Sequence, residues 1–146
     1  MRQTAGAIFV KDGKVLLGKR ASHKASYPDC WDIIGGHVEQ GETVEQALVR
    51  EAQEEVGLTP LKFAAMGSFR ERLYGEATHH VFAVEEWSGG EPCLLGDEHT
   101  QIGWFSVEDA CALEALAAAE YRELFRRLLP AEGAAAARSK RIGLHI

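Results

Sequence analysis

The chain has 146 residues, with 16 Lys and Arg against 22 Asp and Glu, and a formal net charge of −6 at pH 7. A chain of this length is expected to form one domain with a normal hydrophobic core. The negative charge argues against a surface that coats nucleic acid, so we expect no polymeric nucleic acid partner. It is compatible with a small anionic substrate if a bound metal ion supplies positive charge.

The cysteines and the hydropathy pattern bear on the cellular compartment. Cys30, Cys93 and Cys111 are odd in number and have neither paired nor zinc-binding spacing, which favours reduced thiols. The N-terminus has no apolar signal region, and no apolar run is long enough to span a bilayer. We therefore expect a cytoplasmic protein with no membrane partner, and the sequence leaves a homodimer open.

The first part of the chain is predicted to be mostly strand. In chain order it contains strands at residues 4–11 and 14–20, a polar loop at 21–30, and a short apolar run at 31–34. Asp12-Gly13 joins the first two strands and is a strong hairpin signal. Gly35-Gly36 follows the apolar run and begins a glycine-rich loop.

A helix is predicted next, from about residue 43 or 44 to residue 56. Thr43 is a good N-cap residue, and Gln46 three positions later completes a capping box. Gly57 suits the position after the last turn, with Pro60 just beyond it. At about 100° per residue, one face of this helix is apolar; its members are Val44, Ala47, Leu48, Ala52 and Val56.

Three carboxylates, Glu51, Glu54 and Glu55, lie within about one turn of that helix, along one edge of its apolar face. Like charges so close together destabilise a helix, and a carboxylate near a buried face is costly unless it is paired or bound to metal. Oxygen-only ligands favour Mg²⁺ or Mn²⁺ over zinc. The alternative to a metal site is an ordinary Glu-rich helix face exposed to solvent, and the charge pattern alone does not decide between the two.

The second part of the chain continues the sheet and ends in a helix. Strands are predicted at residues 62–73 and 78–87, a turn at 88–92, a polar loop at 96–101, a strand at 102–105, and a helix at about 114–129 ended by Pro130. Ser106 with Asp109 is a further N-cap signature. The domain is predicted to end near residue 130, and residues 131–146 form an Ala-rich extension. This order of elements predicts an α/β sandwich with a mixed sheet.

The segment from Gly36 to Leu58 resembles, position by position, the Nudix box of the Nudix hydrolases. Its fixed members are Gly36, Glu42, Arg50, Glu51, Glu54, Glu55 and Gly57, with Ala52 and Leu58 in the aliphatic positions. Seven residue identities over 23 positions make a chance match very improbable. The resemblance extends over about residues 4–128 and implies a Nudix-type α/β/α sandwich.

The resemblance also implies a reaction. Nudix hydrolases cleave a nucleoside diphosphate linked to another group, using Mg²⁺ or Mn²⁺ and water. It implies metal ligation by Glu51, Glu54 and Glu55 and by the carbonyl of Gly35. Glu51 is also a candidate for orienting or deprotonating the water. The list is completed by Arg50, which would hold a carboxylate of the box in place, by Glu42, which would support the loop, and by Gly36, which would lie at the substrate.

Several residues outside the box are further candidates. Nudix enzymes often use an arginine from the second strand to bind a phosphate, so Arg20 is the first substrate-binding candidate and Arg70 another. Glu98, on a loop before Trp104-Phe105, resembles an extra metal ligand or general base of related enzymes, with Asp97 as its fallback. His79 and His80 are adjacent in a strand, so at most one of them faces a site, and we expect both to be structural or exposed.

The substrate is the least determined property. The segment Trp31-Asp32-x-x-Gly35-Gly36 resembles the MutT-like branch, which acts on nucleoside triphosphates. However, Ile34 replaces the usual proline and the chain has no asparagine to read a base. We therefore favour a (d)NTP or related nucleotide over an oxidised one.

Two alternatives stay open. Lys24, Pro28 and Trp31 are similar to the segment before the box of isopentenyl diphosphate isomerases, although the cysteine those enzymes need is replaced by Ile33 and Ile34. The second alternative is a non-catalytic nucleotide-binding regulator, against which the intact box argues.

Overall fold

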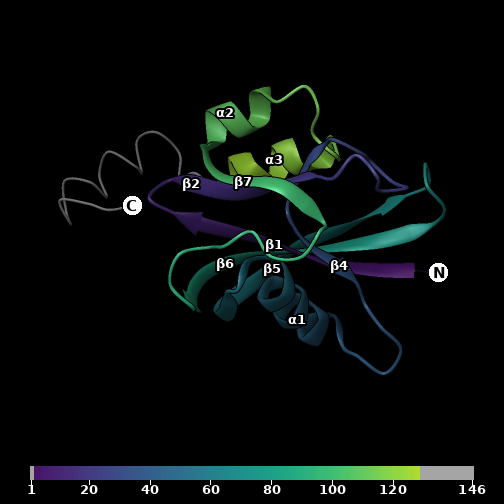
Figure 1. The fold of residues 1–146 in the computed structure, drawn as a ribbon, viewed down its shortest axis with the longest axis horizontal. Coiled ribbons are helices and arrows are strands. Elements are labelled where there is room, and N and C mark those ends of the chain that lie inside the picture. The colour runs from purple at the N-terminus through teal and green to yellow at the C-terminus, as the bar shows by residue number, and fades with distance from the viewer. Residues whose placement is uncertain (1, 129–146) are drawn as a thin grey trace.

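The computed structural model describes residues 2–128 (Figure 1). Its elements are β1 (Arg2–Lys11), β2 (Lys14–Arg20), β3 (Trp31–Asp32), β4 (Ile34–His37), α1 (Val44–Val56), β5 (Thr59–Glu71), β6 (Ala77–Ser88), β7 (His99–Ser106), α2 (Val107–Ala112) and α3 (Glu120–Arg127). The Ala-rich extension predicted at residues 131–146, and Pro130 before it, lie outside the described residues. The domain boundary there stays a prediction.

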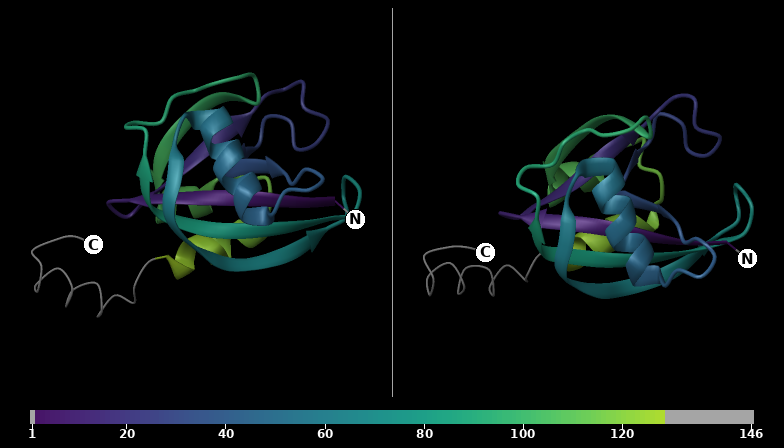
Figure 2. Two further views of the ribbon diagram at one scale, coloured as in Figure 1. Left: turned by 90° about the horizontal axis from the view of Figure 1, so that it is seen from below. Right: turned by 60° about the horizontal axis from the view of Figure 1, so that its bottom comes forward.

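The strands form a mixed sheet, as predicted. β1 pairs in parallel with β6 and antiparallel with β2 and β4, while β5, β7 and β3 add antiparallel pairs to β6 and β2. Helix α1 covers one face of the sheet, and α2 and α3 cover the other (Figures 1 and 2). The predicted α/β/α sandwich is thus confirmed, and β1 is its central strand. The hairpin between β1 and β2 is also confirmed, with positive φ of 53° at Asp12 and 75° at Gly13, the backbone that such a turn needs.

The core has two halves because side chains alternate across each strand. On β1, Ala5, Ala7 and Phe9 point toward α1, whereas Ile8 points toward α2 and α3. The half under α1 consists of Ala5, Ala7, Phe9, Leu16, Ile34, Ala47, Leu48, Ala52, Val56, Leu58, Phe82 and Val84. Helix α1 packs on β1, β4 and β5. This half of the core therefore holds the carboxylate-bearing helix against β4, the strand that contains Gly35 and Gly36.

The ends of α1 agree with the sequence prediction. The Thr43 hydroxyl accepts a hydrogen bond from the Gln46 N–H at 3.0 Å, and the Gln46 side chain accepts one from the Thr43 N–H at 2.8 Å. Gly57 ends the helix with φ of 72°. The helix therefore begins after Thr43 and ends at Val56, so the three carboxylates occupy its last turns.

Two predicted elements near the C-terminus differ from the structure. The helix predicted at residues 114–129 is shorter than expected: in the described part of this range, α3 (Glu120–Arg127) is helical and residues 114–119 are not. A separate short helix, α2, begins at the predicted N-cap Ser106, whose side chain accepts from the Asp109 N–H at 3.0 Å. The segment between them pairs with β3: the Trp31 N–H donates to the Ala115 carbonyl at 2.7 Å, and the Ala117 N–H donates to the Trp31 carbonyl at 2.8 Å. These bonds across the fold compete with helix formation. Likewise β7 begins at His99 rather than at 102, because it pairs with β2 along its whole length.

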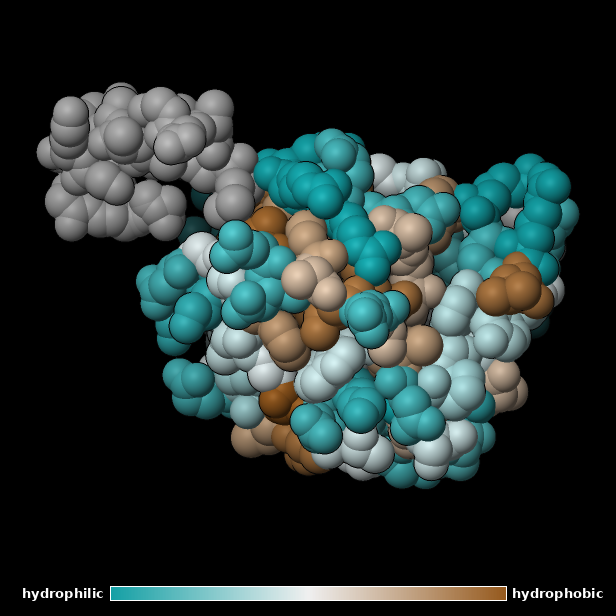
Figure 3. Space-filling view, turned by 90° about the horizontal axis from the view of Figure 1, so that it is seen from above, coloured by the Kyte–Doolittle hydropathy of each residue, from teal (hydrophilic) through white to brown (hydrophobic). Residues whose placement is uncertain are grey.

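Figure 3 shows the face above α2 and α3, where brown apolar side chains are interrupted by teal hydrophilic ones. Within residues 2–128, no helix is long and apolar enough to cross a membrane.

The end of α1 yields a test of its local structure. An L-residue in the left-handed conformation of Gly57 costs about 1–2 kcal/mol, so we expect Gly57→Ala to lower the free energy of unfolding by about that amount. Urea denaturation would measure it. Gly103→Ala is the matched control, since Gly103 lacks a positive φ and an added Cβ would meet its nearest neighbour at 3.6 Å. Equal stability of the two variants would contradict the assigned helix end.

Candidate active site

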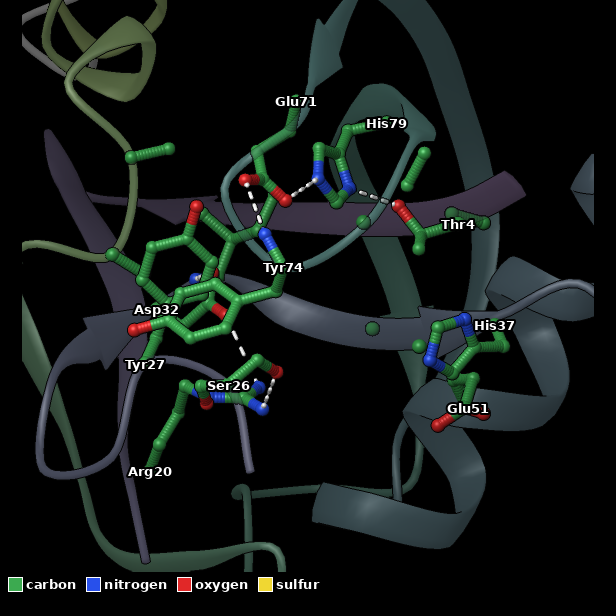
Figure 4. A pocket seen from close by; sticks show the side chains of 18 of the residues that line it. Thr4, Arg20, Ser26, Tyr27, Asp32, His37, Glu51, Glu71, Tyr74 and His79 are labelled. Carbon is green, nitrogen blue, oxygen red and sulfur yellow. Dashed lines mark hydrogen bonds and ion pairs between the residues drawn. The ribbon is translucent and has the colours of Figure 1, made fainter. Parts of the chain in front are cut away.

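A cavity of about 300 Å³ opens beside β4 and α1, and Gly35, Gly36 and His37 of β4 line it together with Glu51 of α1. Figure 4 shows that its lining side chains form two groups. One group contains His37 and Glu51, and the other contains Glu71, His79, the aromatic rings of Tyr27 and Tyr74, and Arg20 with its partners. The cavity therefore joins the carboxylate helix to a separate polar and aromatic wall.

Arg50 organises the carboxylates at the helix. Its guanidinium donates two hydrogen bonds to Glu42, from Nε at 2.7 Å and from Nη2 at 3.0 Å. Its Nη1 donates to Glu51 at 3.0 Å and to Glu54 at 3.2 Å, and Nη2 also donates to the His37 carbonyl at 2.9 Å. The bonds from Arg50 and from the Glu39 N–H lower the pKa of Glu42 to about 2, and the same carboxylates raise the pKa of Arg50. One cation thus ties the loop after β4 to the last turns of α1.

The two glycines before the box allow a close approach of backbone and carboxylate. A Cβ added to Gly36 would lie 2.5 Å from the Glu51 carboxyl carbon, and one added to Gly35 would lie 2.0 Å from the Ala5 carbonyl oxygen. A side chain at Gly36 would displace Glu51, and one at Gly35 would separate β4 from β1. The sequence placed both glycines at the site, and both line the cavity together with Glu51.

Glu55 is buried behind Glu51, beside a residue that sequence reasoning did not single out. The side chains of Glu55 and His99 are each 3% exposed, and Glu55 Oε1 lies 3.6 Å from His99 Nδ1. Burial raises the pKa of Glu55, reinforced by its hydrogen bond to Glu51 and by nearby negative charges, and burial lowers the pKa of His99. Within residues 2–128, Glu55 Oε1 and His99 Nδ1 are the buried side-chain atoms that have no hydrogen-bond partner.

Glu98 lies in the cavity wall and is held by a lysine. Its Oε2 is 2.5 Å from Lys24 Nζ, and both residues line the cavity. Burial of Glu98 opposes its ionisation, but the ion pair with Lys24 and the charge of Arg20 outweigh this effect and lower its pKa. The loop before β7 therefore presents the Glu98 carboxylate to the cavity, whereas its neighbour Asp97, the fallback candidate, does not line it.

The two arginines proposed for substrate binding are placed differently. Arg20 lines the cavity, donates to the Ser26 carbonyl at 2.9 Å and to its hydroxyl at 3.1 Å, and lies 3.4 Å from an Asp32 oxygen. Arg70 does not line it and pairs with Glu76 at 2.9 Å on the exposed surface. The structure does not bring Arg70 to the site, because its position on β5 points it toward solvent.

Sequence reasoning missed several lining residues. His79 was expected to be structural or exposed, yet it faces the cavity, 2.6 Å from the Thr4 hydroxyl and 3.8 Å from Glu71 (Figure 4). Strand alternation could have selected one of the two adjacent histidines but not which one. Tyr27 and Tyr74 pack edge to face at 4.6 Å between ring centres and come from two loops far apart in sequence, so no local signal identifies them.

The donor set fits a hard divalent cation, although it is not arranged as a finished metal site. In the part of the chain that the structure describes, no three His, Cys, Asp or Glu side chains already surround a common point. Arg50 holds two of the carboxylates, and Glu55 keeps an unpartnered buried oxygen. Clustered carboxylate oxygens with an unsatisfied member are what Mg²⁺ or Mn²⁺ would stabilise.

Comparisons with known proteins show the family to which the chain belongs. A family model described as the NUDIX domain matches residues 1–128. The chain is 33% identical over 111 residues to a CTP pyrophosphohydrolase of Escherichia coli K12, covering 75% of this chain and 79% of that protein. It is 36% identical over 106 residues to an 8-oxo-dGTP diphosphatase of the same organism, covering 70% and 77%. It is 45% identical over 104 residues to an ADP-ribose pyrophosphatase of Methanocaldococcus jannaschii, covering 70% of this chain but 60% of that one.

Solved structures show the same architecture. A MutT NUDIX hydrolase from Burkholderia pseudomallei superposes with a TM-score of 0.76 at 29% identity, covering 88% of this chain and 98% of that one. A MutT protein from Methanosarcina mazei Go1 superposes with a TM-score of 0.77 at 26% identity, covering 86% and 91%. The α/β/α sandwich therefore belongs to a known fold.

The Glu42–Arg50 pair predicts a dependence of stability on pH. Because the folded pKa of Glu42 is lowered to about 2, its ionised form stabilises the fold above the unfolded pKa of about 4.3. That contribution is lost as the pH falls through about 2. We expect Glu42→Gln to unfold at a lower urea concentration than the wild type near neutral pH, and the gap between the two midpoints to close between about pH 4 and about pH 2. A gap of constant size over this range would contradict the assigned pair.

Proposed function

Because the chain belongs to the Nudix hydrolase family, we propose that it is a Mg²⁺- or Mn²⁺-dependent pyrophosphohydrolase of a (d)NTP or a related nucleoside diphosphate derivative. The observation that carries this proposal is the carboxylate turn of α1, where Glu51 lies against Gly36 and both line the cavity. Nudix hydrolases generally use a divalent metal, and the three glutamates of this turn offer it carboxylate oxygens. The identity of the metal in this protein is part of the proposal.

Each residue of the site has a separate proposed task. Glu51, Glu54 and Glu55 would hold the cation, with the Gly35 carbonyl and Glu98 as further oxygen donors. Bound there, it would neutralise the diphosphate and lower the pKa of a bound water. Arg50 would hold Glu51 and Glu54 in place, and Glu42 would hold Arg50. Arg20 would bind a phosphate, and Lys24 would balance the negative charge of Glu98.

The reaction balances with water as the only co-substrate. The water oxygen forms a bond to one phosphorus, and the phosphoanhydride P–O bond on that phosphorus breaks. A carboxylate accepts the water's proton, and Glu51 and Glu98 are the candidates because both line the cavity. With a nucleoside triphosphate, we expect a nucleoside monophosphate and pyrophosphate as products.

The relatives support a nucleotide substrate without selecting one. They are named for CTP, 8-oxo-dGTP and ADP-ribose, three substrates that share a nucleoside diphosphate unit. The isomerase alternative gains no support, because Ile33 and Ile34 occupy the strand before the box and both are buried in the core. A cytoplasmic location and a homodimer stay predictions.

Glu54 offers the sharpest test of the metal-binding turn. We expect Glu54→Gln to reduce turnover by about a hundredfold or more, the scale of a lost metal or acid–base group, while the circular dichroism spectrum is unchanged. Glu45→Gln removes the same charge from an exposed position in the first turn of α1 and should leave turnover close to that of the wild type. Near-normal turnover of Glu54→Gln would overturn the assignment.

A substrate panel tests the reaction itself. Nucleoside triphosphates, ADP-ribose, dinucleoside polyphosphates and isoprenoid diphosphates would be incubated with Mg²⁺ and the wild-type protein. We expect cleavage of a nucleotide, with pyrophosphate rather than inorganic phosphate released from a triphosphate. Isomerised isoprenoid without phosphate release would support the isomerase instead, and nucleotide binding without turnover would support a regulator.

A further inference from the structure

A continuous row of contacts runs through the carboxylate cluster, from β4 to β2. At one end, Glu51 occupies the space that a Cβ of Gly36 would fill, 2.5 Å from the Glu51 carboxyl carbon. Glu51 is hydrogen-bonded to Glu55, and Glu55 faces His99 at 3.6 Å. At the other end, the His99 ring occupies the space of a Cβ on Gly18, 2.6 Å from the ring carbon Cδ2. A glycine at each end, Gly36 and Gly18, thus leaves the space that the side chains of Glu51 and His99 occupy.

The centre of the row carries an unusual deficit of hydrogen bonds. Glu55 Oε1 and His99 Nδ1 are buried, close to each other, and without a partner among the residues that the structure describes. Leaving buried polar atoms unpaired is costly, and an apolar pair of the same size would fill this space more favourably. Departures of this kind from good packing are expected where function requires them. Glu55 is next to Glu51 in the carboxylate cluster. We therefore look for the function of the Glu55–His99 pair in the metal binding proposed for that cluster.

Backbone hydrogen bonds also join the loop before β7, which leads to His99, to the end of α1, which carries Glu55. The Leu95 N–H donates to the Glu55 carbonyl at 3.0 Å, and the Cys93 N–H donates to the Val56 carbonyl at 3.0 Å. The loop before β7 is therefore docked on the last turn of α1 before it reaches His99. The last residue of this loop, Glu98, lines the cavity. The next residue, His99, is instead buried, with 5% of its surface exposed.

We propose that His99 is the positioning residue of Glu55: its Nδ1–H donates to Glu55 Oε1 and leaves the other carboxylate oxygen facing Glu51 and the cation. This inference rests on the proposed metal-dependent function and adds a residue outside the box to it. Carboxylates that bind metals are commonly fixed by a hydrogen bond to their second oxygen, and loss of such a partner typically weakens metal affinity by about 10–100-fold. The 3.6 Å separation is a small movement away from a hydrogen bond, which the ring completes when Glu55 turns toward the cation.

The test is the affinity for Mn²⁺ alone, measured by isothermal titration calorimetry without nucleotide. His99→Leu removes the ring nitrogen, whereas His99→Asn has nearly the same shape as Leu and places an amide N–H near the position of Nδ1. We expect His99→Leu to raise the dissociation constant by about tenfold or more and His99→Asn to restore most of the affinity. Equal affinity in the wild type and His99→Leu would overturn the proposal. Equal loss in both variants would also overturn it, because the volume of the ring would then be what matters.

Two further readouts separate this proposal from other failures. If the wild type neither binds Mn²⁺ nor hydrolyses any nucleotide, the proposed function fails; if only the two variants behave alike, the function stands and the role of His99 is wrong. If His99→Leu does not fold, the wild type labelled with ¹⁵N-histidine answers the question. The His99 Nδ1 signal should then shift during a Mg²⁺ titration in step with metal binding, and a signal that does not move would overturn the proposal.

Discussion

The structure depends above all on the guanidinium of Arg50. This single cation is bonded to the His37 carbonyl at the end of β4, to Glu42 on the loop that follows, and to Glu51 and Glu54 on the helix. An arginine has five N–H donors in a planar fork, so it can hold several oxygens at fixed angles where a lysine could not. Without it, the last turns of α1 would place like charges side by side, which destabilises a helix. Arg50 therefore allows a folded protein to keep several carboxylates close together at the end of this helix.

The same arrangement bears on the metal binding that we propose for the cluster. Two carboxylates face Arg50, and the third is buried with one oxygen unpartnered. A divalent cation at this place would compete with Arg50 for Glu51 and Glu54, while Glu42 continues to hold the arginine by two hydrogen bonds. The cavity beside them, with Arg20 and Lys24 in its wall, is where we propose that the substrate binds.

The sequence correctly predicted the helix ends and turns whose structure depends on residues close together in the chain. The capping box at Thr43 and Gln46, the left-handed Gly57 and the Asp12-Gly13 turn were all predicted, because each depends on residues only a few positions apart. Residues 114–119 were predicted to be helical, and their pairing with the Trp31 backbone prevents it. The site followed the same rule. The box carboxylates share one helix and were found together, whereas His99 and Lys24 reach the site through pairings that the sequence does not display.

The central claim is that the last turns of α1 bind the catalytic cation. The most direct measurement is a crystal structure of the protein soaked with Mn²⁺, in which anomalous scattering locates the ion independently of any assumed ligand. The account predicts an anomalous peak within coordination distance of Glu51 and at least one of Glu54 and Glu55, with Arg50 still bonded to Glu42. A peak elsewhere on the protein, or none at a Mn²⁺ concentration that supports hydrolysis, would contradict it.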